Sequence, residues 1–141
     1  YDVVDFVETL MRGRYSEGED QFSAWQHAVE LYRGPFLQGH DETWIMDRRK
    51  AMRTGYLEAV MGMARTYVDR GKGETALKLY RSALDEDFSR EDLHRELMLL
   101  YNELGRRGEA VAHFQQLEKA FNEQDVTLSP QTIEVYNNIM A

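Results

Sequence analysis

The chain has 141 residues, no cysteine and a net charge of −8 from 25 acidic and 17 basic side chains. That length suits one domain with a real core, and the lack of cysteine excludes disulfides and thiolate metal sites. The acidic charge disfavours non-specific nucleic-acid binding by the chain as a whole, and no apolar run reaches the roughly 18 residues of a membrane span.

The first two predicted helices form a pair. Residues 2–14 carry apolar side chains at i, i+3, i+4 and i+7, namely Val3, Phe6, Val7 and Leu10. A second helix over residues 20–32 carries Trp25, Ala28 and Leu31. Proline at Pro35 ends it, because proline lacks the amide and restricts the preceding residue. We expect residues 36–41 to form a loop packed on the helices.

The third predicted helix is the longest. Asp41 or Thr43 can cap its start, and only Gly55 and Gly62 interrupt it before Gly71, which gives about 28 residues and about 42 Å. Glycine inside a helix costs about 1 kcal/mol relative to alanine, so Gly62 indicates a close helix contact. The N-terminal half of this helix exceeds what a two-helix repeat needs, and we expect its apolar side to cover the first pair.

Four cations lie within six positions of this helix and are called the basic stripe below: Arg48, Arg49, Lys50 and Arg53. A solvated helix face is the ordinary interpretation. The alternative is a docking patch for an acidic partner.

Four shorter helices are predicted to follow, over residues 73–85, 90–104, 107–124 and from 130 onward. Ser129 provides a cap and Pro130 a first-turn proline for the last helix. We expect this helix to seal the preceding pair through one apolar side, formed by Ile133, Tyr136, Ile139 and Met140.

Part of the chain repeats at an interval of 34 positions. The four residues Tyr67, Gly71, Ala76 and Tyr80 recur 34 positions later as Tyr101, Gly105, Ala110 and Phe114. This is the period of a tetratricopeptide (TPR) repeat, in which aromatic residues fill gaps beside a paired helix and alanine lets two backbones approach. The glycine just past the first helix of each pair can adopt the left-handed backbone conformation that ends a helix. The first pair matches the same pattern less closely.

The sequence therefore predicts an all-α, TPR-like superhelix of about seven helices. It would consist of three antiparallel pairs and a C-terminal capping helix, in a single domain over residues 1–141.

Catalytic and metal-binding patterns are absent from the sequence. The histidines at 27, 40, 94 and 113 form no i, i+4 pair and no HExxH motif, and the glycines form no phosphate-binding loop. We expect His94 to be packed in the core or at its edge, and His113 to lie on a helix flank. We predict no catalytic residues, no cofactor and no metal, and the chain is not expected to be an enzyme.

Binding is the expected activity of a TPR-like fold. Candidate groove residues on the first helices of the second and third pairs are Arg65, Arg95, Leu99 and Asn102. Clamps for a terminal carboxylate need lysine and asparagine donors, whereas Asp69 and Glu103 stand at such sites, so a receptor for chaperone tails is disfavoured. The groove could equally be filled by the chain's own segments.

Three stretches resemble one family, the bacterial transcriptional activator domain found in regulators similar to the Streptomyces antibiotic regulatory proteins. They are AVELYRGPFL at 28–37 followed by Trp44, REDLHRELM at 90–98 leading to LGRRGEA at 104–110, and LSPQT at 128–132 followed by Val135 and Tyr136. The sequence QDVT at 124–127 departs from the family's usual Leu-Gly-Val-Glu link.

The resemblance implies a cytoplasmic bacterial regulator in which this module mediates dimerisation or contacts with RNA polymerase or a regulatory domain. It also implies that DNA is bound by a winged-helix domain upstream, so the chain is expected to be a piece of a longer protein. Two alternatives stay open: a free-standing TPR adaptor, and a small-molecule sensor with a pocket between the first pair and the long helix.

Overall fold

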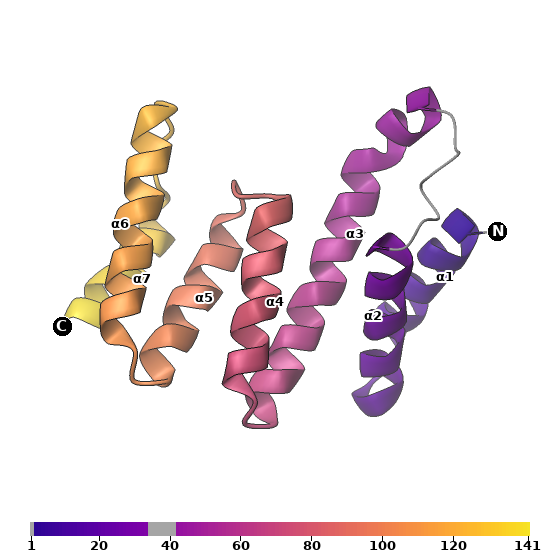
Figure 1. The fold of residues 1–141 in the computed structure, drawn as a ribbon, viewed down its shortest axis with the longest axis horizontal. Coiled ribbons are helices and arrows are strands. Elements are labelled where there is room, and N and C mark those ends of the chain that lie inside the picture. Colours follow the sequence, from indigo (N-terminus) through magenta and orange to yellow (C-terminus); the bar gives the residue numbers. More distant parts are fainter. Residues whose placement is uncertain (1, 34–41) are drawn as a thin grey trace. The chain divides into compact units, whose positions relative to one another are not determined.

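The computed structural model describes residues 2–33 and 42–141, with side chains described from residue 3 to 33 and from 49 onward. This part of the chain consists of helices and connecting turns, without strands, which confirms the all-α, TPR-like prediction (Figure 1). The seven helices are α1 (Asp2–Tyr15), α2 (Gly18–Arg33), α3 (Glu42–Asp69), α4 (Gly73–Glu86), α5 (Glu91–Glu103), α6 (Arg107–Glu123) and α7 (Pro130–Met140).

The predicted caps at Asp41 or Thr43, and the predicted loop over 36–41, lie outside the described side chains and residues. The fold forms two compact units, Tyr1–Gly71 and Lys72–Ala141, and each is described by itself below. A single domain over residues 1–141 stays a prediction.

Glycine ends two of the helices as predicted. Gly71 follows α3 with φ of 75°, and Gly105 follows α5 with φ of 76°. After α5, the amide of Arg106 donates to the carbonyl of Tyr101 and the amide of Gly105 donates to that of Asn102, the pair of bonds that defines a Schellman motif. These bonds satisfy carbonyls that the end of the helix would otherwise leave unpaired.

The first unit is built around Trp25, which belongs to α2 and is 5% exposed. A Cβ atom added at Gly62 of α3 would lie 2.5 Å from Nε1 of Trp25, and one added at Gly13 of α1 would lie 2.5 Å from its Cε3. The indole therefore fits against glycine on two helices, which confirms that Gly62 marks a close contact. Figure 1 shows α1, α2 and α3 side by side.

The middle of α3 packs on the first pair, at Gly55 and Tyr56. The prediction concerned the N-terminal half of this helix, where the side chains of residues 42–48 lie outside the described set. Tyr56 of α3 stacks on Tyr32 of α2 with ring centroids 4.3 Å apart, and its hydroxyl accepts a hydrogen bond from Arg33 at 2.9 Å. A Cβ atom at Gly55 would lie 2.4 Å from Leu10 of α1, so no larger residue fits there without movement.

The second unit has the repeated aromatic and alanine positions in its core. Ala76 and Ala110 are fully buried, and Tyr80, Tyr101 and Phe114 are almost so. The hydroxyl of Tyr80 on α4 donates to Glu96 on α5 at 2.9 Å. One repeat later, the ring of Phe114 on α6 stacks on Tyr136 of α7 with centroids 3.9 Å apart.

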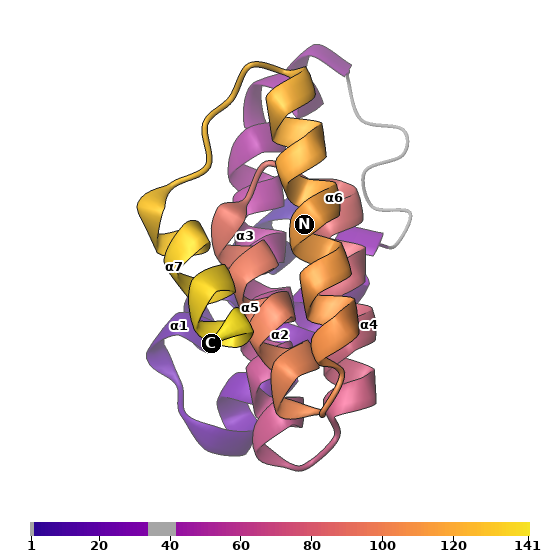
Figure 2. The same cartoon turned by 90° about the vertical axis from the view of Figure 1, so that its left-hand side faces the viewer.

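Helix α7 therefore packs on the last pair as the first helix of a further repeat would, which confirms its sealing role (Figure 2). The predicted apolar side of α7 is partly wrong. Thr132 and Ile139 are buried and Tyr136 is half-buried, whereas Ile133 and Met140 are exposed. Residues 132, 136 and 139 share one helix face at spacings of four and three, and a threonine occupies the first of these positions.

Candidate protein-interaction surfaces

The basic stripe lies in the first half of α3. Arg49 and Lys50 are exposed and Arg53 is half-buried, while the side chain of Arg48 lies outside the described set. Within the described residues, none of Arg49, Lys50 and Arg53 forms an ion pair. Their charges are therefore available to an acidic partner.

The predicted groove residues divide between the two units. Arg65 is exposed on α3 in the first unit, whereas Arg95, Leu99 and Asn102 follow one face of α5 in the second. Leu99 and Asn102 are exposed. Arg95 is half-buried, and its guanidinium donates to the hydroxyl of Thr132 on α7 at 3.0 Å. At Arg95 the chain's own last helix thus occupies the face that a ligand would use.

A carboxylate anchors the start of α7. One oxygen of Glu91 accepts hydrogen bonds from the amide of Ser129 at 2.9 Å, from its hydroxyl at 3.0 Å and from the hydroxyl of Thr132 at 2.7 Å. Burial acts to raise the pKa of Glu91, but these hydrogen bonds, from the Ser129 amide first, outweigh it and lower the pKa. The predicted cap is correct in position only, since Ser129 is the N-cap but its hydroxyl bonds to Glu91 and not to an amide of α7.

The end of α7 is held by a cation. Arg107, the first residue of α6, donates from Nε to the carbonyl of Ile139 and from its terminal nitrogen to that of Met140, both at 2.9 Å. Arginine at a helix C-terminus satisfies carbonyls that lack partners and complements the helix dipole. Helix α7 is thus fixed by side chains at both ends.

Two histidines that the sequence treats separately form a pair. Nδ1 of His94 on α5 lies 2.8 Å from Nε2 of His113 on α6, and Nε2 of His94 lies 2.7 Å from the carbonyl of Phe88. Because a carbonyl only accepts, His94 carries its proton on Nε2, and its Nδ1 accepts from Nε2–H of His113. His94 is fully buried, which agrees with the core position expected for it.

Burial lowers the pKa of both histidines, and for His113 the neighbouring His94 and Arg81 help to lower it to about 4. The sequence pattern does not predict this pair, since it treats His113 as a residue on a helix flank. A signal was present, since His113 shares the i, i+3, i+4, i+7 face of α6 with Ala110, Phe114 and Leu117.

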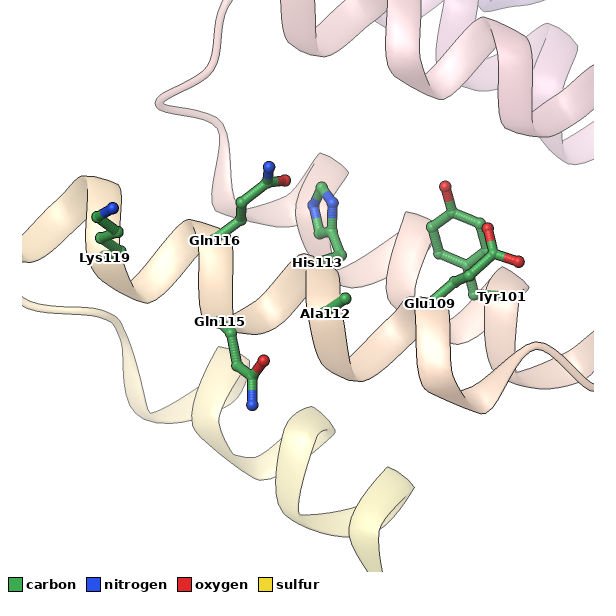
Figure 3. A pocket seen from close by; sticks show the side chains of 7 residues that line it. All are labelled: Tyr101, Glu109, Ala112, His113, Gln115, Gln116 and Lys119. Carbon is green, nitrogen blue, oxygen red and sulfur yellow. The ribbon is translucent and has the colours of Figure 1, made fainter.

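A hollow of about 530 Å³ lies on the second unit, beside this pair. Its lining comes from α6 and one α5 residue, namely Tyr101, Glu109, Ala112, His113, Gln115, Gln116 and Lys119. Figure 3 shows His113 and Gln116 pointing to one side of α6 and Gln115 to the other. The hollow is open and carries both charge signs, so it offers no enclosed site for a cofactor. It is also distinct from the pocket that the sensor alternative expected next to the long helix.

Helix α1 has a second apolar face beside its core face. Phe6, Thr9 and Leu10 are buried. Val7, which was predicted to share that side, is 48% exposed and therefore corrects the prediction. With it lie Val4 at 53%, Met11 at 44% and Tyr15 at 82%; these four residues are called the exposed α1 face.

None of the helices in residues 2–33 and 42–141 combines the length and apolarity needed to cross a bilayer. In the same part of the chain, no three histidine, aspartate or glutamate side chains converge as a metal site would require.

Comparison with known families decides the assignment. The family model of the bacterial transcriptional activator domain matches residues 1–140. The chain belongs to this family. A comparison with curated proteins gave no match.

Membership makes this bacterial transcriptional activator domain a regulatory domain of transcription, of the type found in SARP regulators. One residue of the last loop has an unusual backbone conformation. Asp125, in the link that departs from the family's Leu-Gly-Val-Glu, has φ of 56° and stands where that link has glycine.

Proposed function

We propose that this bacterial transcriptional activator domain is the protein-interaction module of a longer cytoplasmic regulator. It mediates dimerisation or contacts with RNA polymerase or other domains, and it performs no catalysis. A winged-helix domain elsewhere in the same protein recognises DNA. The family match over residues 1–140 is the observation that carries this proposal.

The surface chemistry supports contacts with protein over contacts with DNA. A chain with net charge −8 is repelled by phosphates unless a local cationic patch dominates. The basic stripe is the local exception, and its exposed members have no acidic partner among the described residues. Acidic protein surfaces are partners of matching charge, and complementary charges mainly raise the rate and specificity of association.

Reversing the charges of the basic stripe in the full-length regulator tests the proposal. The variant carries Arg48→Glu, Arg49→Glu, Lys50→Glu and Arg53→Glu, and both promoter activation and dimer formation are measured. We expect at least one of them to fall by tenfold or more, because like charges across a contact cost several kcal/mol.

A matched control reverses exposed cations of the second unit, with Lys78→Glu and Lys119→Glu. We expect this control to retain both activities. Activation and dimerisation that stay at wild-type levels in the stripe variant would remove the basic stripe as the contact surface.

A further inference from the structure

The exposed α1 face is continuous and not a scatter of single residues. Val4, Val7, Met11 and Tyr15 follow at intervals of three, four and four, so they lie along one side of the helix. The 11 residue steps from Val4 to Tyr15 correspond to about 16 Å along the helix. Isolated exposed apolar residues are ordinary in soluble proteins, whereas a contiguous strip indicates an interaction site.

The opposite side of α1 is already used within the first unit. Phe6 and Leu10 are buried there, and Gly13 lies against Trp25 of α2. One flank of the exposed face is also occupied, since Arg14 pairs with Glu58 of α3 at 2.8 Å. A helix with two apolar sides, only one of them covered, fits a partner that supplies a second helix.

The other flank of the exposed α1 face carries one negative and one positive side chain, and their order along the helix favours a second copy of the same helix as the partner. Glu8 and Arg12 are one turn apart and exposed there, and Glu8 forms no ion pair among the described residues. When two identical helices pack antiparallel, each flank meets the same flank of its neighbour in the reverse direction. When the apolar residues of the two helices are centred on each other, Glu8 of one copy lies opposite Arg12 of the other, with an offset along the helix of about the 1.5 Å rise of one residue. The two-fold symmetry produces this Glu8–Arg12 contact twice.

A parallel arrangement lacks this complementarity. It would bring the flank with Glu8 and Arg12 against the opposite flank, where Arg14 is engaged with Glu58. We therefore propose that the exposed α1 face is a self-association surface on which α1 of a second copy packs antiparallel. This inference rests on the proposed function, in which dimerisation is one of the contacts.

The contact is small. One face of a 14-residue helix covers less than the about 800 Å² per partner of an ordinary stable interface. The expected dimer is consequently weak and depends on concentration.

Charge exchange tests the proposal on the 141-residue chain, by sedimentation velocity over a concentration series. The single variants Glu8→Arg and Arg12→Glu each place like charges opposite each other in the homodimer, and each should weaken dimerisation by about tenfold or more. Mixed in equal amounts, the two variants place arginines opposite glutamates at both sites. We expect the mixture to dimerise as the wild type does.

A second pair of variants tests the apolar strip. Val7→Gln with Met11→Gln should leave the chain monomeric, while Val126→Gln with Ile133→Gln, at exposed apolar positions of the second unit, should leave the dimer intact. Thermal unfolding of every variant checks that the variant is folded, so that a loss of dimer can be assigned to the contact.

Two results would overturn the proposal: a wild-type chain that stays monomeric up to millimolar concentration, or single charge variants that dimerise as the wild type does. The proposed regulatory role is judged separately, by activation in the variant of the basic stripe, which leaves α1 unchanged.

Discussion

At the scale of single residues, the packing of the first unit depends on two glycines, which have no side chain where Trp25 lies. Trp25 occupies the space that Cβ atoms would take at Gly13 and Gly62, with separations of 2.5 Å at both. Real Cβ atoms do not approach ring atoms so closely, and the indole is too enclosed to move aside. Helix interiors disfavour glycine, so its presence here reflects packing.

Gly62→Ala is expected to lower the free energy of unfolding by about 1 to 3 kcal/mol, the usual cost of overfilling a core. Gly108→Ala is the matched control, because it also lies in a helix but has nothing within 4 Å of the added Cβ. The control should be neutral or stabilise by up to about 1 kcal/mol. Denaturation by urea measures both, and equal effects in the two variants would refute the role of Trp25.

At Asp125, unlike at Gly62, a substitution is expected to stabilise the protein. It follows α6 with φ of 56°, and the amide of Val126 donates to the carbonyl of Phe121, so an aspartate holds the left-handed position of a Schellman motif. Asp125→Gly should raise the free energy of unfolding by about 1 kcal/mol, because only glycine adopts this conformation without strain. Gly105→Ala, at the equivalent place after α5, should lower it by a similar amount. Loss of stability in Asp125→Gly would show that the aspartate side chain contributes more than the strain costs.

The histidine pair predicts a pH dependence. Burial lowers the pKa of His113 to about 4 and lowers that of His94, whereas a histidine in the unfolded chain has a pKa of about 6.5. The unfolded state therefore binds more protons below pH 6.5. The stability that the neutral pair contributes is complete above that pH and is lost as the pH falls towards 4. Arg81 on α4 opposes protonation of His113, and Glu91 and Asp92 on α5 partly favour protonation of His94.

Unfolding free energies between pH 7 and pH 4 measure this loss. His113→Gln keeps an N–H donor for His94 but does not titrate, so its profile should be flatter by up to about 1.4 kcal/mol per pH unit. His27→Gln, which changes an exposed residue of α2, is the control. Identical slopes for His113→Gln and the wild type would contradict the assignment of a neutral pair.

At the scale of helices, α7 is attached by a polar contact at each end and by one aromatic stack between them. Glu91 binds its first turn, Arg107 binds its last carbonyls, and Tyr136 stacks on Phe114. Short helices depend on such tertiary contacts, because they are marginal in isolation.

Glu91→Ala leaves the fully buried hydroxyl of Thr132 without its carboxylate acceptor. The Thr132 hydroxyl keeps a contact with the Ser129 hydroxyl at 3.2 Å, but the Ser129 amide loses its acceptor. Losing hydrogen bonds to a charged group costs about 1 to 3 kcal/mol, and we expect amides of α7 to exchange about 5- to 100-fold faster while those of α5 and α6 change little. Hydrogen exchange measures this directly. Glu118→Ala, an exposed position of α6, is the control. Uniform acceleration over the second unit would show that α7 does not open by itself.

The positions of the helices were predictable because residues next to each helix terminus determine where the helix ends. Glycine at 71 and 105 and the proline at 130 lie next to helix termini, and the observed limits differ from the predicted ones by two residues or fewer. Local rules do not say which face of a helix is covered. Helix α1 has two apolar strips, and Val7 was assigned to the core although Val7 lies on the exposed one.

The sequence pattern also did not predict contacts between residues that lie far apart in the chain. His94 and His113 are 19 positions apart, and Ser129 bonds to Glu91 across 38. The 34-residue repeat places helices relative to each other but does not specify which polar side chains meet.

At the scale of the whole molecule, two compact units, over Tyr1–Gly71 and Lys72–Ala141, together match one family over residues 1–140. Each unit has a candidate surface of its own. The first carries the basic stripe and the exposed α1 face, and the second carries Leu99 and Asn102 on α5. The common feature is exposed side chains on rigid helices, which suits recognition of proteins.

Tethering tests most directly whether the domain acts through protein contacts. In a first fusion, the 141-residue chain is joined to a DNA-binding domain that binds its site upstream of a weak promoter as a monomer. In a second fusion, it is joined to a DNA-binding domain that binds DNA only as a dimer. The account predicts that the fusion raises transcription in the first case or restores DNA occupancy in the second. A folded fusion that does neither would contradict it.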